Sequence, residues 1–326
     1  MLKFDYMIEA EGMAKRFRSR ASVVEAVRSV DIEVSPGEIV GFLGPNGAGK
    51  TTTLRMLTTL LAPDAGEATV AGHDLRREPV AVRRRIGYVP QRGSTTPQAQ
   101  VGEELVDHGR LHGLSRAEAT ERGRALLGRL DLDGTWERPT GTLSGGQRRR
   151  LDIALGLINQ PPLLFMDEPT TGLDPQSRAN LWSHIRELRD GHGVTVFLTT
   201  HYLDEADALC DRILVIDHGS IVAEGTPGAL KANLSGDRVA LRLADPESLP
   251  AGMAVAERID RATLLRAEGD LLDVSLPDAA AAVPGLLDGL AREGVVLAGI
   301  EIHRPSLDDV FLSLTGRELR DQPVAA

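Results

Sequence analysis

Short apolar runs alternate with longer amphipathic stretches over the first two-thirds of the chain. This pattern is typical of strand–helix–strand units and of a mostly parallel sheet. Five of the runs are predicted strands: Ile39–Leu43, Ile86–Val89, Leu163–Met166, Val194–Leu198 and Ile213–Ile216. The runs at 163–166 and 194–198 are apolar almost throughout, as expected of strands that are covered on both faces. No strand pattern is seen between about residues 100 and 160, where three helical patterns predict an insertion: Glu103–Leu114, Arg116–Leu130 and Gln147–Asn159.

The pattern changes after residue 228. Three strand-like runs follow, at Val239–Leu243, Leu271–Leu276 and Gly294–Ile302, with a helical pattern at Asp278–Arg292. A last amphipathic helix is predicted at 307–314, where the preceding serine can cap it. We therefore predict a cassette-sized domain over 1–228, with its helical subdomain at about 92–160, and a small α+β domain over 229–326.

Composition narrows the class of protein. The 326 residues are 42% hydrophobic and 26% charged, which is usual for a globular chain. A single cysteine, Cys210, excludes a disulfide scaffold and any site with several cysteine ligands. The net charge of −10 argues against a general nucleic-acid binder, so no nucleic acid partner is expected. No signal peptide is visible, and no apolar run approaches the roughly 18–20 residues that a spanning helix needs.

A glycine-rich segment after the first predicted strand carries the strongest chemical signal. Gly44-Pro45-Asn46-Gly47-Ala48-Gly49-Lys50-Thr51 matches the phosphate-loop pattern G-x-x-x-x-G-K-[ST] without a mismatch, and a predicted helix opens at Thr52. The glycines let backbone N–H groups turn toward phosphate oxygens, and the helix N-terminus adds a positive dipole. Lys50 is expected to neutralise the β- and γ-phosphates of a nucleotide, and the Thr51 hydroxyl to bind Mg²⁺. An ordinary glycine turn that caps a helix is the plainer alternative.

Two carboxylates end the run at Leu163–Met166. In an open α/β sheet, ligands bind at the carboxyl ends of the strands, so Asp167 is expected beside the phosphate loop. There it can hold Mg²⁺, usually through water, and Glu168 can polarise a water molecule as a general base. The alternative is that these carboxylates only cap a helix.

A second Ser/Gly-rich segment opens another predicted helix. Leu143-Ser144-Gly145-Gly146-Gln147 makes an anion site of the same physical kind as the phosphate loop, but without a lysine. Both segments are used if two copies of the chain share each nucleotide, so we predict a homodimer. A serine that merely caps its helix is the plainer reading.

These three motifs, in this order and spacing, resemble the nucleotide-binding subunits of ATP-binding-cassette (ABC) transporters over about residues 8–228. The resemblance implies a phosphate-loop ATPase fold of the ABC cassette type: a mostly parallel sheet with a helical subdomain. It also makes 143–147 the signature motif, which contacts the nucleotide held by the facing subunit. The arginines that follow at 148–150 are expected to support that facing site.

The resemblance implies roles for four further residues. Gln91 stands where the family has its glutamine loop, which bridges Mg²⁺ and the attacking water. His201 resembles the switch histidine and Asp174 the aspartate loop at the dimer interface. Phe17 takes the place of the aromatic residue that stacks on adenine.

The end of the chain, from Arg304 to Gly316, resembles drug-exporter ATPases of the daunorubicin/doxorubicin-resistance type. Many of those carry methionine in place of Gln147, and some carry glutamine in place of His201, so the drug itself stays open. The resemblance implies ATP hydrolysis coupled to export of a drug, antibiotic or lipid-like compound through a separate multi-span permease, at the cytoplasmic face of the membrane. The alternative is a soluble ABC ATPase that acts on ribosomes or DNA and moves no solute.

Overall fold

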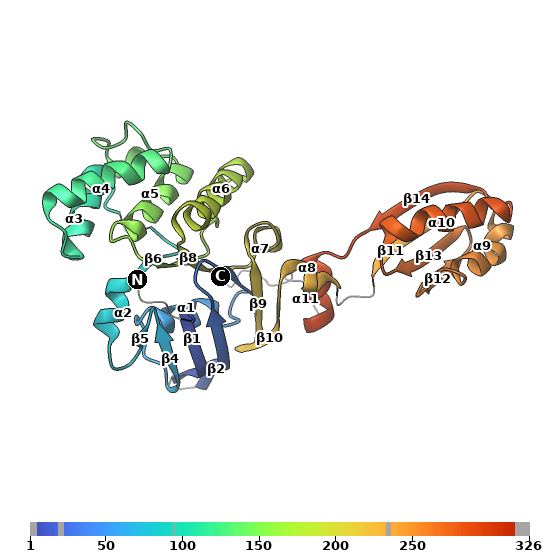
Figure 1. The fold of residues 1–326 in the computed structure, drawn as a ribbon, viewed down its shortest axis with the longest axis horizontal. Coiled ribbons are helices and arrows are strands. Elements are labelled where there is room, and N and C mark those ends of the chain that lie inside the picture. The colour runs from blue at the N-terminus through green and yellow to red at the C-terminus, as the bar shows by residue number, and fades with distance from the viewer. Residues whose placement is uncertain (1–4, 19–22, 94, 233–235, 317–326) are drawn as a thin grey trace. The chain divides into compact units, whose positions relative to one another are not determined.

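Five parallel strands form the part of the sheet that positions the candidate site. The computed structural model describes residues 5–18, 23–93, 95–232 and 236–316 (Figure 1). The five strands run in the order β9-β3-β8-β7-β6 and are mostly buried. Their bounds are β3 (Ile39–Leu43), β6 (Ile86–Val89), β7 (Leu163–Asp167), β8 (Thr195–Thr200) and β9 (Arg212–Asp217). All five predicted strands are confirmed to within about two residues, because a fully apolar run has few other ways to be buried.

The sheet continues beyond β9 with strands that the sequence interpretation did not include. They are β10 (Ser220–Gly225), β2 (Val23–Val34), β1 (Ile8–Arg18), β4 (Ala65–Val70) and β5 (His73–Asp74), and the complete order is β5-β4-β1-β2-β10-β9-β3-β8-β7-β6. In β1, buried Ile8, Ala10 and Met13 share the strand with exposed charged residues. Register shifts after Ala10 interrupt the two-residue period. The sheet is therefore mixed, and its added half is mainly antiparallel.

The predicted helical insertion is present between β6 and β7. It contains α3 (Val101–Leu111), α4 (Arg116–Arg129), the 3₁₀ turn η1 (Thr140–Thr142) and α5 (Gly145–Leu157) (Figure 1). The Trp136 ring fills the space beside α3 and α4, because a Cβ on Gly102 would lie 2.2 Å from it and one on Gly123 3.1 Å from it. The other helices of this part are α1 (Lys50–Leu57), α2 (Pro79–Arg85), α6 (Pro175–His192) and α7 (Leu203–Leu209), and α8 (Pro227–Ala232) begins at the boundary with the second unit.

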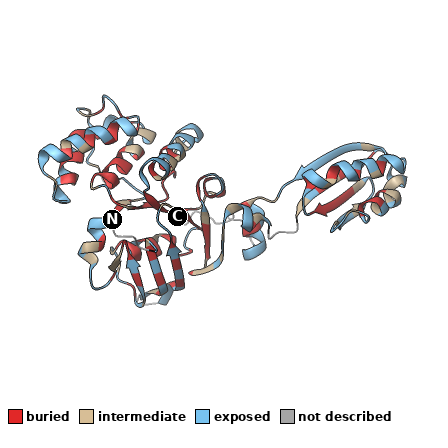
Figure 2. Ribbon diagram, viewed as in Figure 1, coloured by how far each residue is buried: buried red, intermediate tan, exposed pale blue. Residues whose placement is uncertain are grey.

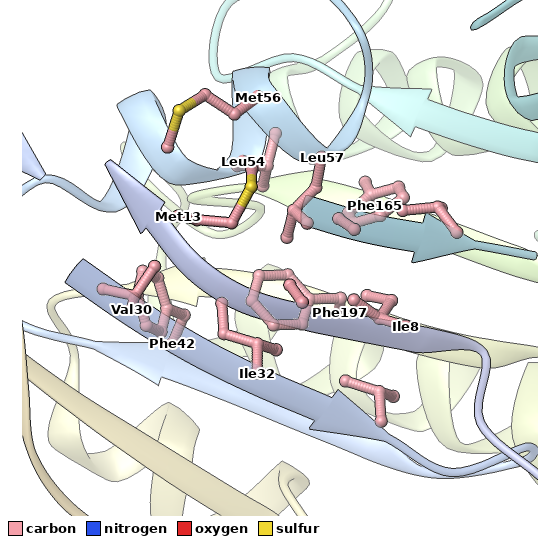
Figure 3. Close-up of a cluster of buried hydrophobic side chains, with 14 of the residues drawn as sticks. Ile8, Met13, Val30, Ile32, Phe42, Leu54, Met56, Leu57, Phe165 and Phe197 are labelled. Carbon is pink, nitrogen blue, oxygen red and sulfur yellow. The ribbon is translucent and has the colours of Figure 1, made fainter. Parts of the chain in front are cut away.

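Aromatic side chains from adjacent strands join the sheet to its covering elements. The Phe197 ring lies 5.6 Å from that of Phe42 and 5.8 Å from that of Phe165, measured between centroids. The same buried cluster includes Leu54 and Leu57 of α1 together with residues of β1 and β2 (Figure 3). Such tilted aromatic contacts favour one fixed arrangement. The core thus packs α1 against the aromatic side chains of β3, β7 and β8.

Contacts divide the chain into two compact units at Pro227 and Gly228. The second unit has an antiparallel sheet, β12-β13-β11-β14, and the connectivity β-α-β-β-α-β. Its elements are β11 (Asp237–Leu243), η2 (Pro246–Ser248), α9 (Leu249–Ala256), β12 (Thr263–Glu268), β13 (Leu271–Leu276), α10 (Ala279–Arg292), β14 (Leu297–His303) and α11 (Leu307–Thr315). It has a hydrophobic core of its own (Figure 2). The sequence analysis missed β12 and α9, and the α+β character that it predicted is confirmed.

Among the described residues, no helix combines the length and the apolar character that crossing a bilayer requires.

Candidate functional site

The candidate site lies where four neighbouring parallel strands end. The phosphate loop follows β3, His201 follows β8, Glu168 follows β7 and Gln91 comes two residues after β6. Because these strands are adjacent in the sheet and parallel, their carboxyl ends share one edge. Residues that are more than 100 positions apart in the chain are thereby brought together.

Glycines of the phosphate loop are required by close approach and by backbone conformation. A Cβ on Gly44 would lie 2.3 Å from the Ile216 carbonyl oxygen, and one on Gly49 would lie 2.5 Å from that of Ala26. Gly49 also has φ of 112°, which side chains rarely tolerate. At Gly47, φ is 79° and no atom lies within 4 Å of the position that a Cβ would take. The loop therefore fits tightly on its protein side and has open space at Gly47, three residues before the start of α1, where a helix dipole favours an anion.

Lys50 is the buried cation of this loop. Its side chain is only 4% exposed, and its ammonium group donates to the carbonyl oxygens of Gly44, at 2.6 Å, and Pro45, at 3.1 Å. It also lies 3.5 Å from Glu168 Oε1. Burial lowers the pKa of Lys50, and the nearby Glu168 carboxylate opposes that shift. A phosphate that entered the loop could take the place of Glu168 as the partner of this cation.

Oxygen atoms suited to a hard divalent cation converge next to Lys50. The Thr51 hydroxyl donates to Asp167 Oδ1 at 3.1 Å, and the Thr199 hydroxyl donates to the same oxygen at 2.7 Å. Asp167 is 2% exposed. A hydroxyl and a carboxylate at hydrogen-bond distance, beside a phosphate-sized loop, are the donor set that Mg²⁺ takes in nucleotide sites. The residues therefore fit the metal that the sequence implies.

Glu168 is held on several sides. Its Oε2 accepts from Gln91 Nε2 at 2.7 Å and from the Thr171 hydroxyl at 3.3 Å, and its Oε1 lies 3.2 Å from His201 Nδ1. Its backbone has φ of 44°, in the left-handed region. Burial by itself raises the pKa of this carboxyl, but His201 and then Lys50 outweigh it and hold the pKa at about 2. Glu168 is therefore ionised and able to accept a proton or to orient a water molecule.

The signature motif and the aspartate loop occupy two adjacent helix starts. The Ser144 hydroxyl accepts from the Gln147 backbone N–H at 3.2 Å, and Gln147 Oε1 accepts from the Ser144 backbone N–H at 3.1 Å. Asp174 caps α6 by accepting from the Ser177 amide at 3.0 Å and from its hydroxyl at 2.6 Å. A Cβ on Gly146 would lie 2.9 Å from the Ser177 hydroxyl, so the two motifs adjoin. Ser144 and Gly145 are exposed, and nothing lies near the Cβ position of Gly145, so this helix start is open.

Phe17 lies on β1 and is 44% exposed, with the Lys15 ammonium 5.9 Å from the centre of its ring. An exposed ring of this kind is free to stack on a planar ligand. Its role in adenine binding stays a prediction.

Several residues of the site were missed from the sequence. Thr199 contacts Asp167 from the adjacent strand β8, which only the three-dimensional strand order reveals, whereas Thr171 contacts Glu168 from three residues further along the chain. Arg149 was expected, with its two arginine neighbours, to support the nucleotide site of a facing subunit, and for this residue the expectation is wrong. Its side chain is buried in its own subunit, where it donates to backbone carbonyl oxygens at the site. The only signal in the sequence was its position among apolar residues on one side of α5.

Asp152, beside Arg149, leads to a test of pH dependence. Burial raises the pKa of this carboxyl to about 6, although Arg149 opposes the shift. Between pH 4 and 6 the folded chain therefore keeps a proton that the unfolded chain has lost, and stability falls as the pH rises through this window. Asp152→Asn removes that titration. We expect its free energy of unfolding, relative to the parent, to increase by about 2–3 kcal/mol from pH 4 to pH 7. Urea denaturation at each pH measures this difference, and a difference independent of pH would contradict the assignment.

Comparisons with known proteins agree with this geometry. A family model described as ABC transporter matches residues 27–171. The chain is 45% identical over 320 residues to a daunorubicin/doxorubicin resistance ATP-binding protein of Streptomyces peucetius, covering 97% of this chain and 94% of that protein. It is 40% identical over 296 residues to a Nod factor export ATP-binding protein of Paraburkholderia xenovorans, covering 90% of this chain and 93% of that one. A solved dimeric ATP-binding cassette, in a post-hydrolysis state with ADP and Pi, aligns with a TM-score of 0.62 at 26% identity, covering 68% of this chain and 98% of that one.

Proposed function

Because this chain belongs to the ABC transporter family as an ATP-binding subunit, we propose that it hydrolyses ATP to drive export of a drug, antibiotic or lipid-like compound. The observation that carries this proposal is the position of the Glu168 carboxyl group, held by Gln91 and His201 beside a complete phosphate loop. The assignment to an exporter of a drug, antibiotic or lipid-like compound rests on the similar proteins. One is named for daunorubicin/doxorubicin resistance and another for Nod factor export, and each covers nearly the whole of this chain.

We assign phosphate binding to residues 44–52, the loop and first turn of α1. Lys50 would bind the β- and γ-phosphates, with backbone N–H groups of the loop on the other oxygens. Thr51, Asp167 and the side-chain oxygen of Gln91 would hold Mg²⁺, Asp167 through water. The metal supplies positive charge where negative charge develops on the phosphates. Phe17 would stack on the adenine.

Glu168 is proposed as the general base. In the structure, Lys50 is one of the charges that keep its pKa low. When the Lys50 ammonium turns to a phosphate, Glu168 loses that partner, and the pKa of its carboxyl rises toward the range in which a base is effective. Gln91 and His201 would then orient the attacking water and stabilise the transferred phosphoryl group.

In this proposal, the exposed helix start at Ser144–Gln147 acts on the nucleotide of a second copy of the chain. The backbone N–H groups of Gly145 and Gly146, which lie outside the capping hydrogen bonds of Ser144 and Gln147, would bind the nucleotide held by another copy of the chain, with Asp174 at the interface. A head-to-tail homodimer would thus enclose two ATP molecules. Relatives with solved structures include a dimeric cassette, which supports this arrangement.

A separate multi-span permease would supply the transport path, and this chain would bind it from the cytoplasmic side. Contact is expected near residues 91–100 and on the helical subdomain at about 92–160. Gln91 would link that surface to the nucleotide, because its amide reaches Glu168 while its loop leads into the insertion.

Affinity purification of tagged Glu168→Gln chain from detergent-solubilised membranes of the source organism, with Mg-ATP, tests the proposal. We expect a stoichiometric membrane protein with several spans to be identified by mass spectrometry. The tagged parent chain without nucleotide is the matched control. Recovery of ribosomal or DNA-repair proteins without a membrane partner would refute the exporter assignment and leave the ATPase chemistry intact.

A further inference from the structure

Arg149 joins three parts of the site through one buried guanidinium. It lies in the first turns of α5, and the residue is only 7% exposed. Its Nε donates to the Pro169 carbonyl oxygen at 2.6 Å, and its Nη1 donates to that of Pro90 at 2.6 Å. Its Nη2 donates to the carbonyl oxygens of Asp167, at 3.1 Å, and Glu168, at 3.4 Å. The three nitrogens thus bind four carbonyl groups of two separate segments, residue 90 and residues 167–169.

Those carbonyl groups belong to the backbone that carries the reactive side chains. Pro90 directly precedes Gln91, and residues 167–169 contain both carboxylates of the site. Glu168 has φ of 44°, and a non-glycine residue keeps such a conformation only when its surroundings fix it. The planar guanidinium presents donors in a rigid fork, so it can fix several acceptors at once.

The charge of Arg149 is balanced from its own helix. Asp152 Oδ2 lies 3.6 Å from Arg149 Nη1, one turn further along α5, and it is also buried. The guanidinium therefore does not need an acid from the nucleotide site, and the carboxylates of Asp167 and Glu168 stay available. It meets those two residues only through their backbone.

We propose that Arg149 is a positioning residue for hydrolysis: it sets the backbone of Glu168 and of the segment before Gln91 against the helix that begins with the signature motif. The inference deepens the proposed function and rests on it. Because α5 begins at Gly145, a movement of that helix on nucleotide binding is transmitted to the backbone of Glu168 through one rigid side chain. Neither contact with ATP nor a proton transfer is assigned to Arg149.

Arg149→Lys keeps the charge but has one nitrogen in place of the fork, so it tests positioning rather than charge. In the full-length chain we expect kcat for ATP to fall at least tenfold, with KM for Mg-ATP within twofold of the parent. Leu157→Ala is the matched control, since it removes a buried side chain of the same helix that has no part in the site. We expect it to lower the thermal midpoint by as much or more while kcat stays within twofold. Unchanged kcat in Arg149→Lys, or an equal loss in both variants, would overturn the inference.

Amide hydrogen exchange of the nucleotide-free chain gives a second readout, independent of turnover. We expect the peptides containing residues 88–93 and 167–171 to exchange at least tenfold faster in Arg149→Lys than in Leu157→Ala. Equal exchange in these peptides would overturn the positioning role. Assays of the parent and Glu168→Gln chains in parallel distinguish a failure of this inference from a failure of the proposed function. No ATP hydrolysis by the parent, or equal hydrolysis by both chains, would count against the proposed function. The exchange result would still decide the role of Arg149.

Discussion

Glu168→Gln is expected to lower ATP turnover by about 10²–10⁴-fold, the usual contribution of a general base, while ATP binding is retained. The amide has the size of the carboxylate and can still accept from Gln91 and Thr171, which contact Glu168 at 2.7 and 3.3 Å. It cannot take a proton from water. The phosphate loop is untouched, so Lys50 still binds phosphate. Steady-state phosphate release measures turnover, and calorimetric titration with Mg-ATP measures binding.

A buried carboxylate outside the site provides the control for this variant. Asp273, in the second unit, is 1% exposed and lies 2.5 Å from Arg238. Asp273→Asn also neutralises a buried, paired acid, and we expect its turnover to stay within about twofold of the parent, because it affects stability alone. With Mg-ATP, Glu168→Gln should in addition elute as a dimer from a sizing column. Turnover near the parental value in Glu168→Gln would mean that another group activates water.

The parallel half of the sheet could be predicted because apolar residues predominate in the central positions of its strands. Residues 163–166 and 195–198 have one plausible environment, a layer covered on both faces, and such runs specify their own structure. The strands β1 and β2 carry charged residues at many positions, and the register shifts of β1 blur the alternation that would have identified them. Their pairing depends on partners far along the chain, which local patterns do not contain.

The candidate site likewise has a part that the sequence predicts and a part that it does not. The phosphate loop is a local structure, in which Gly44, Gly49 and Lys50 are needed within a few residues of one another, so a sequence pattern identifies it. The surroundings of Glu168 are not local: Thr199 and Arg149 reach it from β8 and α5. Arg149 has two arginine neighbours in the sequence, and only the direction in which α5 faces makes it the buried one. Motifs thus indicate which groups react, and the fold determines what holds them.

Lys50→Met is expected to weaken Mg-ATP binding by about 10–100-fold, since a hydrogen bond to a charged group contributes about 1.5–3 kcal/mol. The methionine keeps most of the aliphatic chain, so the loss is that of the ammonium group. The variant should also raise the pKa of the Glu168 carboxyl. Burial raises that pKa, and Lys50 is one of the charges that lower it. Thermal shift with increasing Mg-ATP measures the affinity, because a ligand stabilises the fold in proportion to RT ln(1 + [L]/Kd).

Lys231→Met, on α8, is the matched control for Lys50→Met, since it removes the same group outside the site. It should bind Mg-ATP as the parent does. The two site variants are then expected to differ in kind. Glu168→Gln binds ATP, dimerises and does not turn over, whereas Lys50→Met fails at the first step and stays monomeric at ATP concentrations that saturate the parent. Parental affinity in Lys50→Met would show that the ammonium serves only its contacts with Gly44, Pro45 and Glu168. Phosphate recognition would then rest on the backbone N–H groups of the loop and the dipole of α1, because these are the other positive groups that the loop presents.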